Sequence, residues 1–246
     1  MDPFTPPAFV SLPEVDSTNE YAKRLVSKNK PPEGTVIFAS RQTSGKGQFG
    51  KSWESEPEKN LTCSVILYPV FLEARLAHLL NQIISLSLRD LMDALGISVK
   101  IKWPNDIYHH DKKLAGLLIE NGLIGEHVSY SIAGIGLNVN QTRFSPDIPN
   151  PTSLKLISGK DFKLEKLLKK FLPFIEKRYL QLKTKVYAEI KSDYENSLYR
   201  LNEKARYRKS TEQFEGIICG VSDEGQLKMQ VSGTIRLYST NEIIYL

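Results

Sequence analysis

Helical spacing of apolar residues appears in four stretches of the chain. Residues 73–96 carry leucine and isoleucine at three- and four-residue intervals and stop at Gly96, which is typical of a helix with a glycine end. Residues 161–185 repeat this spacing, and a further helix is expected over about 186–201. A short amphipathic helix is expected after Asp16-Ser17-Thr18, because such residues favour helix starts.

Strand patterns fill most of the remaining chain. Residues 35–40 and 61–69 are rich in β-branched residues, and residues 98–140 predict a string of strands separated by turn residues. Short strands joined by glycine turns follow residue 205. The pattern predicts an α+β fold, a mixed sheet flanked by helices, with a larger domain over 1–205 and a small β-barrel over 206–246.

Composition is that of an ordinary globular protein, with 41% hydrophobic and 25% charged residues among 246. No apolar run reaches the roughly 20 residues that a membrane helix needs, and the N-terminal stretch carries no signal-peptide pattern. We therefore expect a cytoplasmic protein with no membrane partner. The two cysteines and four histidines show no metal-ligand spacing, so no metal site made by a protein cluster is predicted.

The charge balance is mildly basic, with a formal net charge of +5 and a pI near 9.0. That sign suits a phosphate-rich or acidic partner. Most of the excess comes from a lysine-rich region over residues 160–209, whose charges are explained equally well by a solvated helix face. A non-catalytic nucleic-acid-binding module therefore stays open as an alternative, although charge alone supports it weakly.

A glycine-rich stretch over residues 45–52, GKGQFGKS, fits the phosphate-loop pattern G-x-x-x-x-G-K-[ST]. A true P-loop needs a strand that runs directly into the loop and a helix that begins at its Lys-Ser. Here four residues separate the preceding strand from Gly45, and a polar segment with Pro57 follows Ser52. We reject the P-loop and predict an anion-binding loop, in which glycines allow close backbone approach and Lys46 and Lys51 supply charge.

A second group of polar residues lies at a predicted hairpin. Pro104 ends a strand, Asn105-Asp106 forms a turn, and Lys113 returns on the next strand. If the two strands pair around a tight turn, Lys113 comes back close to Asp106. Such a pair is either a site for an anionic ligand or a screened surface ion pair, and the spacing leaves both open.

Four motifs together resemble the biotin–protein ligase (biotin–[acetyl-CoA carboxylase] ligase) family. GKGQFGKSW at residues 45–53 resembles that family's GRGRxGRxW signature, and KWPND at 102–106 with KLAG at 113–116 matches its KWPND…KLAG segment. DSTN at 16–19 and GIGLNVN at 134–140 are similar to two further family motifs. Four motifs in the family's order are far more specific than any one of them.

The resemblance implies a class II aminoacyl-tRNA synthetase-like catalytic domain with a C-terminal SH3-like β-barrel. It also implies a two-step reaction that uses ATP, biotin and Mg²⁺. Biotin's carboxylate attacks the α-phosphorus of ATP to give biotinyl-5′-adenylate. A lysine of a biotin carboxyl carrier protein domain then takes the biotinyl group.

Roles for individual residues follow from the same resemblance. Lys113 is expected to be catalytic and to contact the biotin carboxylate and the α-phosphate, while Asp106 would orient or deprotonate the incoming lysine. The residues expected to bind biotin are Ser17, Thr18, Asn19, Gln42, Lys46, Gly47, Gln48, Lys113 and Gly116. Those expected to bind ATP or the adenylate are Gly45, Lys46, Gln48, Gly50, Trp53, Asn105, Lys113 and Asn138.

The chain departs from the family pattern in three ways. Gln48 stands where the family has an arginine, and Lys46 and Lys51 replace arginines, which keeps the charge but loses the bidentate fork. Because DSTN begins at residue 16, we expect a ligase without the DNA-binding domain of bifunctional members, hence no DNA partner. Homodimerisation is common in the family, and no motif here fixes an interface. Lipoate–protein ligase, which shares the fold and the adenylation chemistry, is the nearest alternative.

Overall fold

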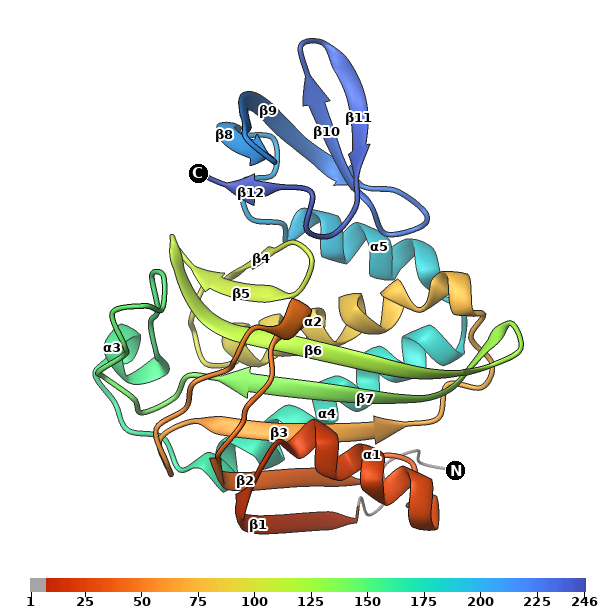
Figure 1. Ribbon diagram of the computed structural model, residues 1–246, viewed down its shortest axis with the longest axis vertical. Helices are drawn as coiled ribbons and strands as arrows, with labels where there is room; N and C mark the ends of the chain where they lie inside the picture. Colours follow the sequence, from red (N-terminus) through yellow and green to blue (C-terminus); the bar gives the residue numbers. More distant parts are fainter. Residues whose placement is uncertain (1–7) are drawn as a thin grey trace.

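A seven-stranded sheet forms the centre of the larger part of the molecule (Figure 1). The structure is a computed structural model that describes residues 8–246; the first seven residues, part of the stretch examined for a signal peptide, lie outside the described residues. The strands lie in the order β1-β2-β3-β7-β6-β5-β4, with β1 and β2 parallel and the other neighbours antiparallel. The strands are β1 (Phe9–Val15), β2 (Val36–Gln42), β3 (Leu61–Leu67), β4 (Lys100–Lys102), β5 (Asp106–His109), β6 (Lys112–Ile124) and β7 (His127–Leu137).

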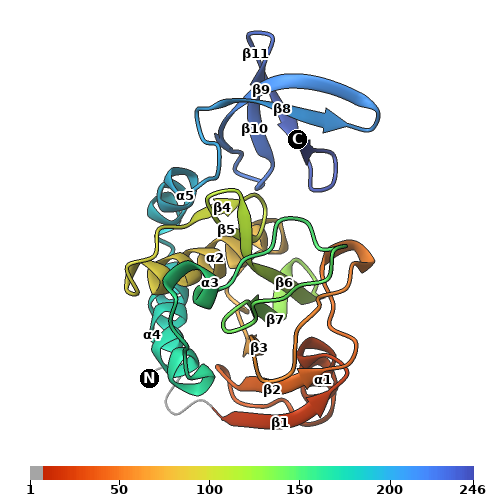
Figure 2. The ribbon, with the colours of Figure 1, turned by 90° about the vertical axis from the view of Figure 1, so that its left-hand side faces the viewer.

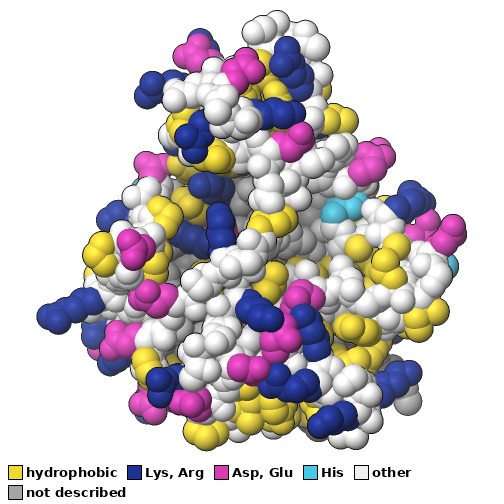
Figure 3. All heavy atoms as spheres, in the orientation of Figure 1, with side chains coloured by type: hydrophobic (Ala, Val, Ile, Leu, Met, Phe, Trp, Pro, Cys, Tyr) yellow, Lys and Arg dark blue, Asp and Glu magenta, His cyan; other side chains and the backbone are white. Residues whose placement is uncertain are grey.

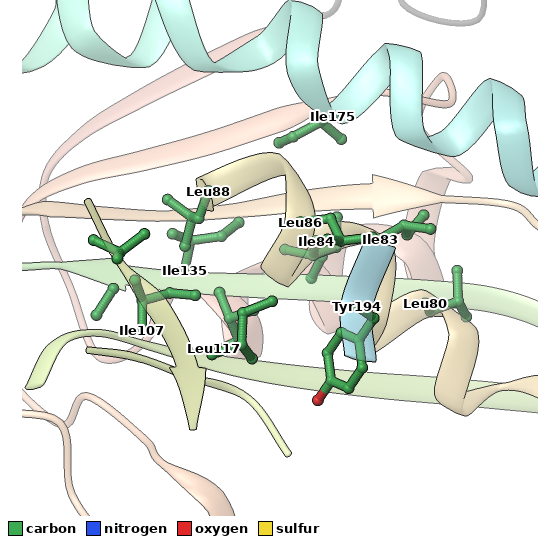
Figure 4. Close-up of a cluster of buried hydrophobic side chains, with 14 of the residues drawn as sticks. Leu80, Ile83, Ile84, Leu86, Leu88, Ile107, Leu117, Ile135, Ile175 and Tyr194 are labelled. Carbon is green, nitrogen blue, oxygen red and sulfur yellow. The ribbon is translucent and has the colours of Figure 1, made fainter. Parts of the chain in front are cut away.

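Three helices cover one face of this sheet, namely α2 (His78–Asp93), α4 (Leu164–Lys183) and α5 (Tyr187–Asn196) (Figures 1 and 2). Apolar side chains of α2 pack between the sheet and α4, as Figure 4 shows for Ile83 and Ile175. A short helix, α3 (Leu154–Ser158), lies in the connection after β7. No helix within residues 8–246 is long and apolar enough to cross a membrane.

The predicted helices are confirmed, but two of them are shorter than their apolar spacing indicates. The start of the 73–96 stretch is a 3₁₀ turn, η2 (Ala74–Leu76), because Ala74 N donates to Glu126 O of the β6–β7 hairpin. The end of the 186–201 stretch leaves the helix because Ile101 N donates to Ser197 O and Tyr199 N to Ile101 O. In both places pairing with a distant strand prevails over local helical preference.

On the opposite face of the sheet the described residues place one helix, α1 (Thr18–Asn29) (Figure 1). Side chains alternate between the two faces, so Val36 and Phe38 of β2 enter the main core while Ile37 faces α1. Ile37 packs there with Ile66, Ile132 and Ala22 in a small separate cluster. This cluster covers only part of the face, and the rest is left for a site.

The C-terminal segment forms a second sheet in the strand order β11-β10-β9-β8-β12, whose strands are labelled in Figure 1. The strands are β8 (Lys204–Lys209), β9 (Glu212–Val221), β10 (Leu227–Val231), β11 (Thr234–Tyr238) and β12 (Ile244–Tyr245). Within residues 8–246 no pairing joins β11 to β12, so this sheet is open and the closed SH3-like barrel is not confirmed. The division into 1–205 and 206–246 stays a prediction; Tyr207 and Ile218 belong to the same buried cluster as the main core.

A buried ion network joins the three helices of the covered face. Arg178 on α4, only 5% exposed, donates from Nε to Asp90 on α2 at 2.7 Å and from Nη1 to Asp193 on α5 at 2.6 Å. Arg89 reaches the other oxygen of Asp90 at 2.6 Å. Burial acts to raise the pKa of Asp90, but the hydrogen bonds from Arg178 and Arg89 outweigh it and hold this pKa below its ordinary value of 3.8.

Replacing Asp90 by alanine should therefore destabilise the fold. Removing one partner of a buried pair leaves Arg178 undercompensated, so we expect the free energy of unfolding at neutral pH to fall by about 3 kcal/mol. A depressed folded-state pKa contributes stability above the unfolded-state value that is lost as pH falls through the folded value. The difference between wild type and Asp90→Ala should therefore shrink below pH 3.8.

Urea denaturation at a series of pH values measures this difference. The matched control is Asp93→Ala on the same helix, since Asp93 is 60% exposed and 3.7 Å from Arg89. The Asp93→Ala substitution should lower the free energy of unfolding by less than about 1 kcal/mol. Equal losses in the two variants would contradict the assigned role of the network.

Candidate active site

A cavity of about 320 Å³ opens on the part of the sheet that α1 leaves uncovered. Its walls come from the start of α1, the glycine-rich loop, strands β5 to β7 and the end of the chain. The space-filling view shows the surface hollowed below the C-terminal sheet, with Lys and Arg side chains beside the hollow (Figure 3). The predicted site residues that line it are Ser17, Thr18, Asn19, Gln42, Lys46, Gly47, Gln48, Trp53, Asn105, Asp106, Lys113 and Gly116.

The remaining predicted residues, Gly45, Gly50 and Asn138, are not among the lining residues. Asn138 is buried, and its Nδ2 donates to Thr152 O at 2.9 Å. This bond holds the segment after β7 against the chain near α3. The contact of Asn138 with a nucleotide stays a prediction.

A buried polar network forms where α1 begins. Thr18 donates to Gln42 Oε1 from its backbone N at 2.8 Å and from Oγ1 at 3.1 Å. Ser64 Oγ of β3 lies 2.7 Å from Thr18 Oγ1 and 2.6 Å from Asn19 Oδ1. The motif at residues 16–19 predicted two of these four positions, Thr18 and Asn19, and Gln42 was also expected, whereas Ser64 was missed because its strand is mostly apolar.

The end of this network is fixed by carboxylates from distant positions. Asn19 Nδ2 donates to Glu120 Oε2 of β6 at 2.9 Å, and Lys23 joins Glu120 at 2.6 Å and Glu20 at 2.9 Å. Glu20 also accepts from Lys46 of the glycine-rich loop at 2.8 Å, and its pKa is lowered by the hydrogen bonds from Lys46 and then Lys23. No local pattern in the sequence marks Glu120, which is about a hundred residues away from Asn19 and Lys23.

The glycine-rich loop is a hairpin. Lys46 and Ser52 face each other in an isolated bridge, and Trp53 N donates to Gly45 O at 2.8 Å. Between them lies a single 3₁₀ turn, η1 (Gln48–Gly50), in which Phe49 has a left-handed φ of 58°. No α-helix starts at the Lys-Ser, so the rejection of the P-loop is confirmed.

The floor of the cavity is flat because glycines stand at three positions on β6 and β7. A Cβ at Gly136 would overlap the indole ring of Trp53, and a Cβ at Gly134 would overlap the amide of Asn19. Gly116 also lies against the Trp53 ring. The indole Nε1 is buried and finds no hydrogen-bond partner in the described chain, so it is a free donor at the floor.

The predicted approach of Lys113 to Asp106 is confirmed. Asp106 lies opposite Gly116 in the ladder, and a bulge after Ile107 brings Lys113 Nζ within 2.8 Å of Asp106 Oδ1. Lys113 Nζ also lies 5.6 Å from the centroid of the Trp53 ring. Both side chains line the cavity, which favours the anion-site interpretation over a screened surface pair.

The same wall includes residues that were not among the predicted site residues. Lys102 stands at the end of β4, and Asn241, Ile243, Ile244 and Tyr245 come from the last residues of the chain. No local pattern marks these C-terminal residues as part of a site. Only the position of the C-terminal sheet over the hairpin brings them to the cavity.

Comparison with known proteins identifies the family. The model of the biotin/lipoate A/B protein ligase family matches residues 11–138. The bifunctional ligase/repressor BirA of Bacillus spizizenii is 32% identical over 233 residues, which cover 92% of this chain and 71% of the relative. The chain belongs to the biotin/lipoate A/B protein ligase family.

Two further members of the ligase family extend the comparison. A biotin–[acetyl-CoA-carboxylase] ligase of Paracoccus denitrificans is 29% identical, with 88% of this chain and 91% of the relative aligned. The structure of the Aquifex aeolicus biotin protein ligase in complex with biotin and ATP superposes with a TM-score of 0.81 and 31% identity, covering 96% of this chain and 97% of that one. The family resemblance of the four motifs is therefore confirmed.

The packing of Trp53 on the glycine floor can be tested without a ligand. The chain has two tryptophans, so Trp53 is the sole emitter in a Trp103→Phe background. In that background Gly136→Ala should displace the indole and shift its emission to longer wavelength, because the new methyl group would occupy the same space. Gly116→Ala, whose Cβ would lie 3.0 Å from the ring, should give a smaller shift. An unchanged spectrum in Gly136→Ala would contradict the placement of Trp53.

Proposed function

We propose that the protein is a biotin–protein ligase that forms biotinyl-5′-AMP from biotin and ATP and transfers biotin to a lysine of a biotin carboxyl carrier protein domain. The observation that carries this proposal is one cavity with a network of hydroxyl and amide groups where α1 begins and with Lys113 and Lys102 toward β4. Biotin is divided in the same way, because it carries a neutral urea ring at one end and a carboxylate at the other. The likeness to a ligase structure that holds biotin and ATP supports it.

The polar network suits the urea ring of biotin. A urea presents an oxygen that accepts and two N–H groups that donate, so it needs donors and acceptors at fixed positions. Thr18, Gln42 and Ser64 offer hydroxyl and amide groups held by one another at hydrogen-bond distance. We therefore assign biotin binding to Ser17, Thr18, Asn19 and Gln42, as the motif implied, and add Ser64.

Lys113 is suited to the first step. The step joins two anions, the biotin carboxylate and the α-phosphate of ATP, and charge grows on the phosphate oxygens as the bond to pyrophosphate breaks. A fixed cation between the two ends of the cavity offsets their repulsion and stabilises that charge. Lys113 lies above Gly116, next to Trp53, in this position.

Asp106 is suited to the second step. Transfer requires that the carrier's lysine lose a proton before its amine attacks the mixed anhydride. Asp106 is the one carboxylate among the described residues that line the cavity, and it accepts from Lys113 at 2.8 Å. We assign to it the binding of the incoming ammonium group.

Mg²⁺ is expected to enter with ATP. It favours phosphate oxygens together with one or two carboxylates, and a single carboxylate on the cavity wall fits a metal held mainly by the nucleotide. Within residues 8–246 no group of three or more His, Cys, Asp or Glu side chains is arranged to hold an ion. When bound, Mg²⁺ would neutralise part of the triphosphate charge.

One assay separates this function from its alternatives. The protein is incubated with ATP and either biotin or lipoate, and pyrophosphate release is measured; transfer of labelled biotin to a carrier domain follows. We expect pyrophosphate with biotin only. Release with lipoate alone would favour a lipoate ligase, and release with neither, combined with salt-sensitive oligonucleotide binding, would favour a nucleic-acid-binding module.

Lys113→Ala should almost abolish adenylate formation. Loss of a preorganised charge at the reacting phosphate costs on the order of 10²- to 10³-fold in rate. The control is Lys112→Ala, because Lys112 is exposed and neighbouring residues of a strand point to opposite faces. Near-normal pyrophosphate release by Lys113→Ala would refute its role.

Ser64→Ala should weaken biotin binding without slowing the bound complex. The hydroxyl holds Thr18 and Asn19 in place, and a buried hydrogen bond contributes on the order of 1 kcal/mol, so the KM for biotin should rise about 5- to 10-fold. Because the chemistry lies at the other end of the cavity, kcat should change little. A drop in kcat at unchanged KM would show that the residue acts elsewhere.

A further inference from the structure

Lys102 is a partly buried cation for which the site described so far has no use. It ends β4 and lies directly opposite Asp106 in the β4–β5 ladder. Asp106 is nevertheless engaged by Lys113. The Lys102 ammonium instead donates to Tyr108 Oη at 3.1 Å and lies 4.8 and 4.7 Å from the ring centroids of Tyr108 and Tyr245.

The charge on the cavity wall is unbalanced. Lysines 46, 51, 102 and 113 line the cavity against the single carboxylate of Asp106. Lys46 is paired with Glu20 and Lys113 with Asp106, whereas Lys51 and Lys102 form no ion pair with a carboxylate in the part of the chain described here. Burial lowers the pKa of Lys102; the charge of Asp106 opposes this shift, whereas the charges of Lys113, Arg200 and Lys51 add to it, and the pKa stays below its ordinary value. Keeping an unpaired ammonium in such surroundings is costly for the free protein, which is typical of a site that awaits an anion.

The strand order indicates where Lys102 lies relative to the bound biotin and the α-phosphate of ATP. The urea network belongs to α1, β2 and β3, Lys113 to β6, Asp106 to β5 and Lys102 to β4 at the end of the sheet. A ligand that lies across the strands with its ring at Thr18 and its carboxylate at Lys113 therefore has Lys102 beyond the α-phosphate. In phosphoryl and nucleotidyl transfer the attacking and leaving oxygens lie roughly in line, on opposite sides of phosphorus.

We propose that Lys102 is a catalytic residue of the adenylation step, whose ammonium binds the β- and γ-phosphate oxygens of ATP and the departing pyrophosphate. This inference rests on the proposed function. A biotin carboxylate oxygen forms the new bond to the α-phosphorus, and the bond from that phosphorus to the oxygen bridging to the β-phosphate breaks. The bonding electrons leave with pyrophosphate. Lys102 stabilises the added charge without giving up its proton.

Two tyrosines contact the Lys102 ammonium and position it. Tyr108 comes from the adjacent strand β5, and Tyr245 comes from β12 of the C-terminal sheet. Burial raises the pKa of both phenols, so both stay neutral and leave the lysine charge unopposed. The rings attract the cation weakly compared with a carboxylate, so it is free to bind phosphate. The C-terminal sheet thereby takes part in the first half-reaction.

The test separates the two half-reactions in Lys102→Gln. Pyrophosphate–ATP exchange in the presence of biotin reports the first, and transfer from preformed biotinyl-5′-AMP to a carrier domain reports the second. We expect the KM values for ATP and pyrophosphate to rise by about 10- to 100-fold, which is the range for losing a charge-assisted hydrogen bond. Transfer from the preformed adenylate should stay within about twofold, because no pyrophosphate is present in that step.

Two further variants make the outcome specific. Lys102→Arg keeps the cation and should recover most of the pyrophosphate KM. Lys100→Gln, on the same strand with an exposed side chain that reaches only Asn196 O, should behave as wild type. Normal transfer by Lys102→Gln also shows that the variant is folded.

Other results would overturn the inference. If exchange and transfer both fall together, Lys102 supports the structure or contacts the adenosine; if neither changes, it contacts no phosphate. Wild-type protein that shows no biotin-dependent exchange would refute the proposed function itself, and the inference with it. Normal wild-type activity with an unchanged Lys102→Gln refutes the inference alone.

Discussion

The central sheet packs against helices with one face and forms the cavity with the other. Alternate residues of the same strands supply these two faces, so each strand has to meet both requirements. On β3 and β7 the residues facing α2 and α4 are apolar, whereas Ser64, Gly134 and Gly136 face the other way. Alternation is strict, so a shift of one residue in register would place glycines in the core and isoleucines in the cavity. The site therefore depends on the pairing of β3 with β7, in which Ser64 lies opposite Gly134.

The distribution of charge follows from that arrangement. Neutral donors and acceptors gather where α1 covers the sheet, because an unpaired charge there would be buried beside Ile37 and Ile66. Lys113 and Lys102 lie toward β4, where α1 does not cover the face and on whose side the C-terminal sheet lies (Figure 1). An elongated ligand with one neutral end and one anionic end has a single favourable direction in such a cavity.

Many of the site residues and helices could be predicted from local sequence. The predictions that were wrong or incomplete share one cause, which is contact between residues far apart in the chain. The β5–β6 hairpin brought Lys113 to Asp106 as expected, because a tight turn is encoded by adjacent residues. The absence of an α-helix after Ser52 was likewise predicted, from the polar segment with Pro57 that follows it. Glu120 and Tyr245 could not be found, because each meets its partner only through a side-chain contact between residues a hundred or more positions apart, Glu120 with Asn19 and Tyr245 with Lys102. The predicted helix ends near residues 74 and 198 were wrong for a similar reason, because backbone hydrogen bonds to distant segments replaced helical hydrogen bonds there.

One departure from the family pattern, Lys46, is explained by its contact with Glu20. Lys46, in place of an arginine, has a single ammonium group, and in the free protein Glu20 occupies it. Glu20 is joined through Lys23 to Glu120, which orients Asn19 at the head-group network. The loop is thus tied to the biotin end of the cavity by one chain of ion pairs, while Gln48 adds no cation at its tip. Lys46, Glu20, Lys23 and Glu120 form one connected series of charged contacts that ends at Asn19, so a change in the contact between Lys46 and Glu20 alters the electrostatic environment of the residues that orient Asn19.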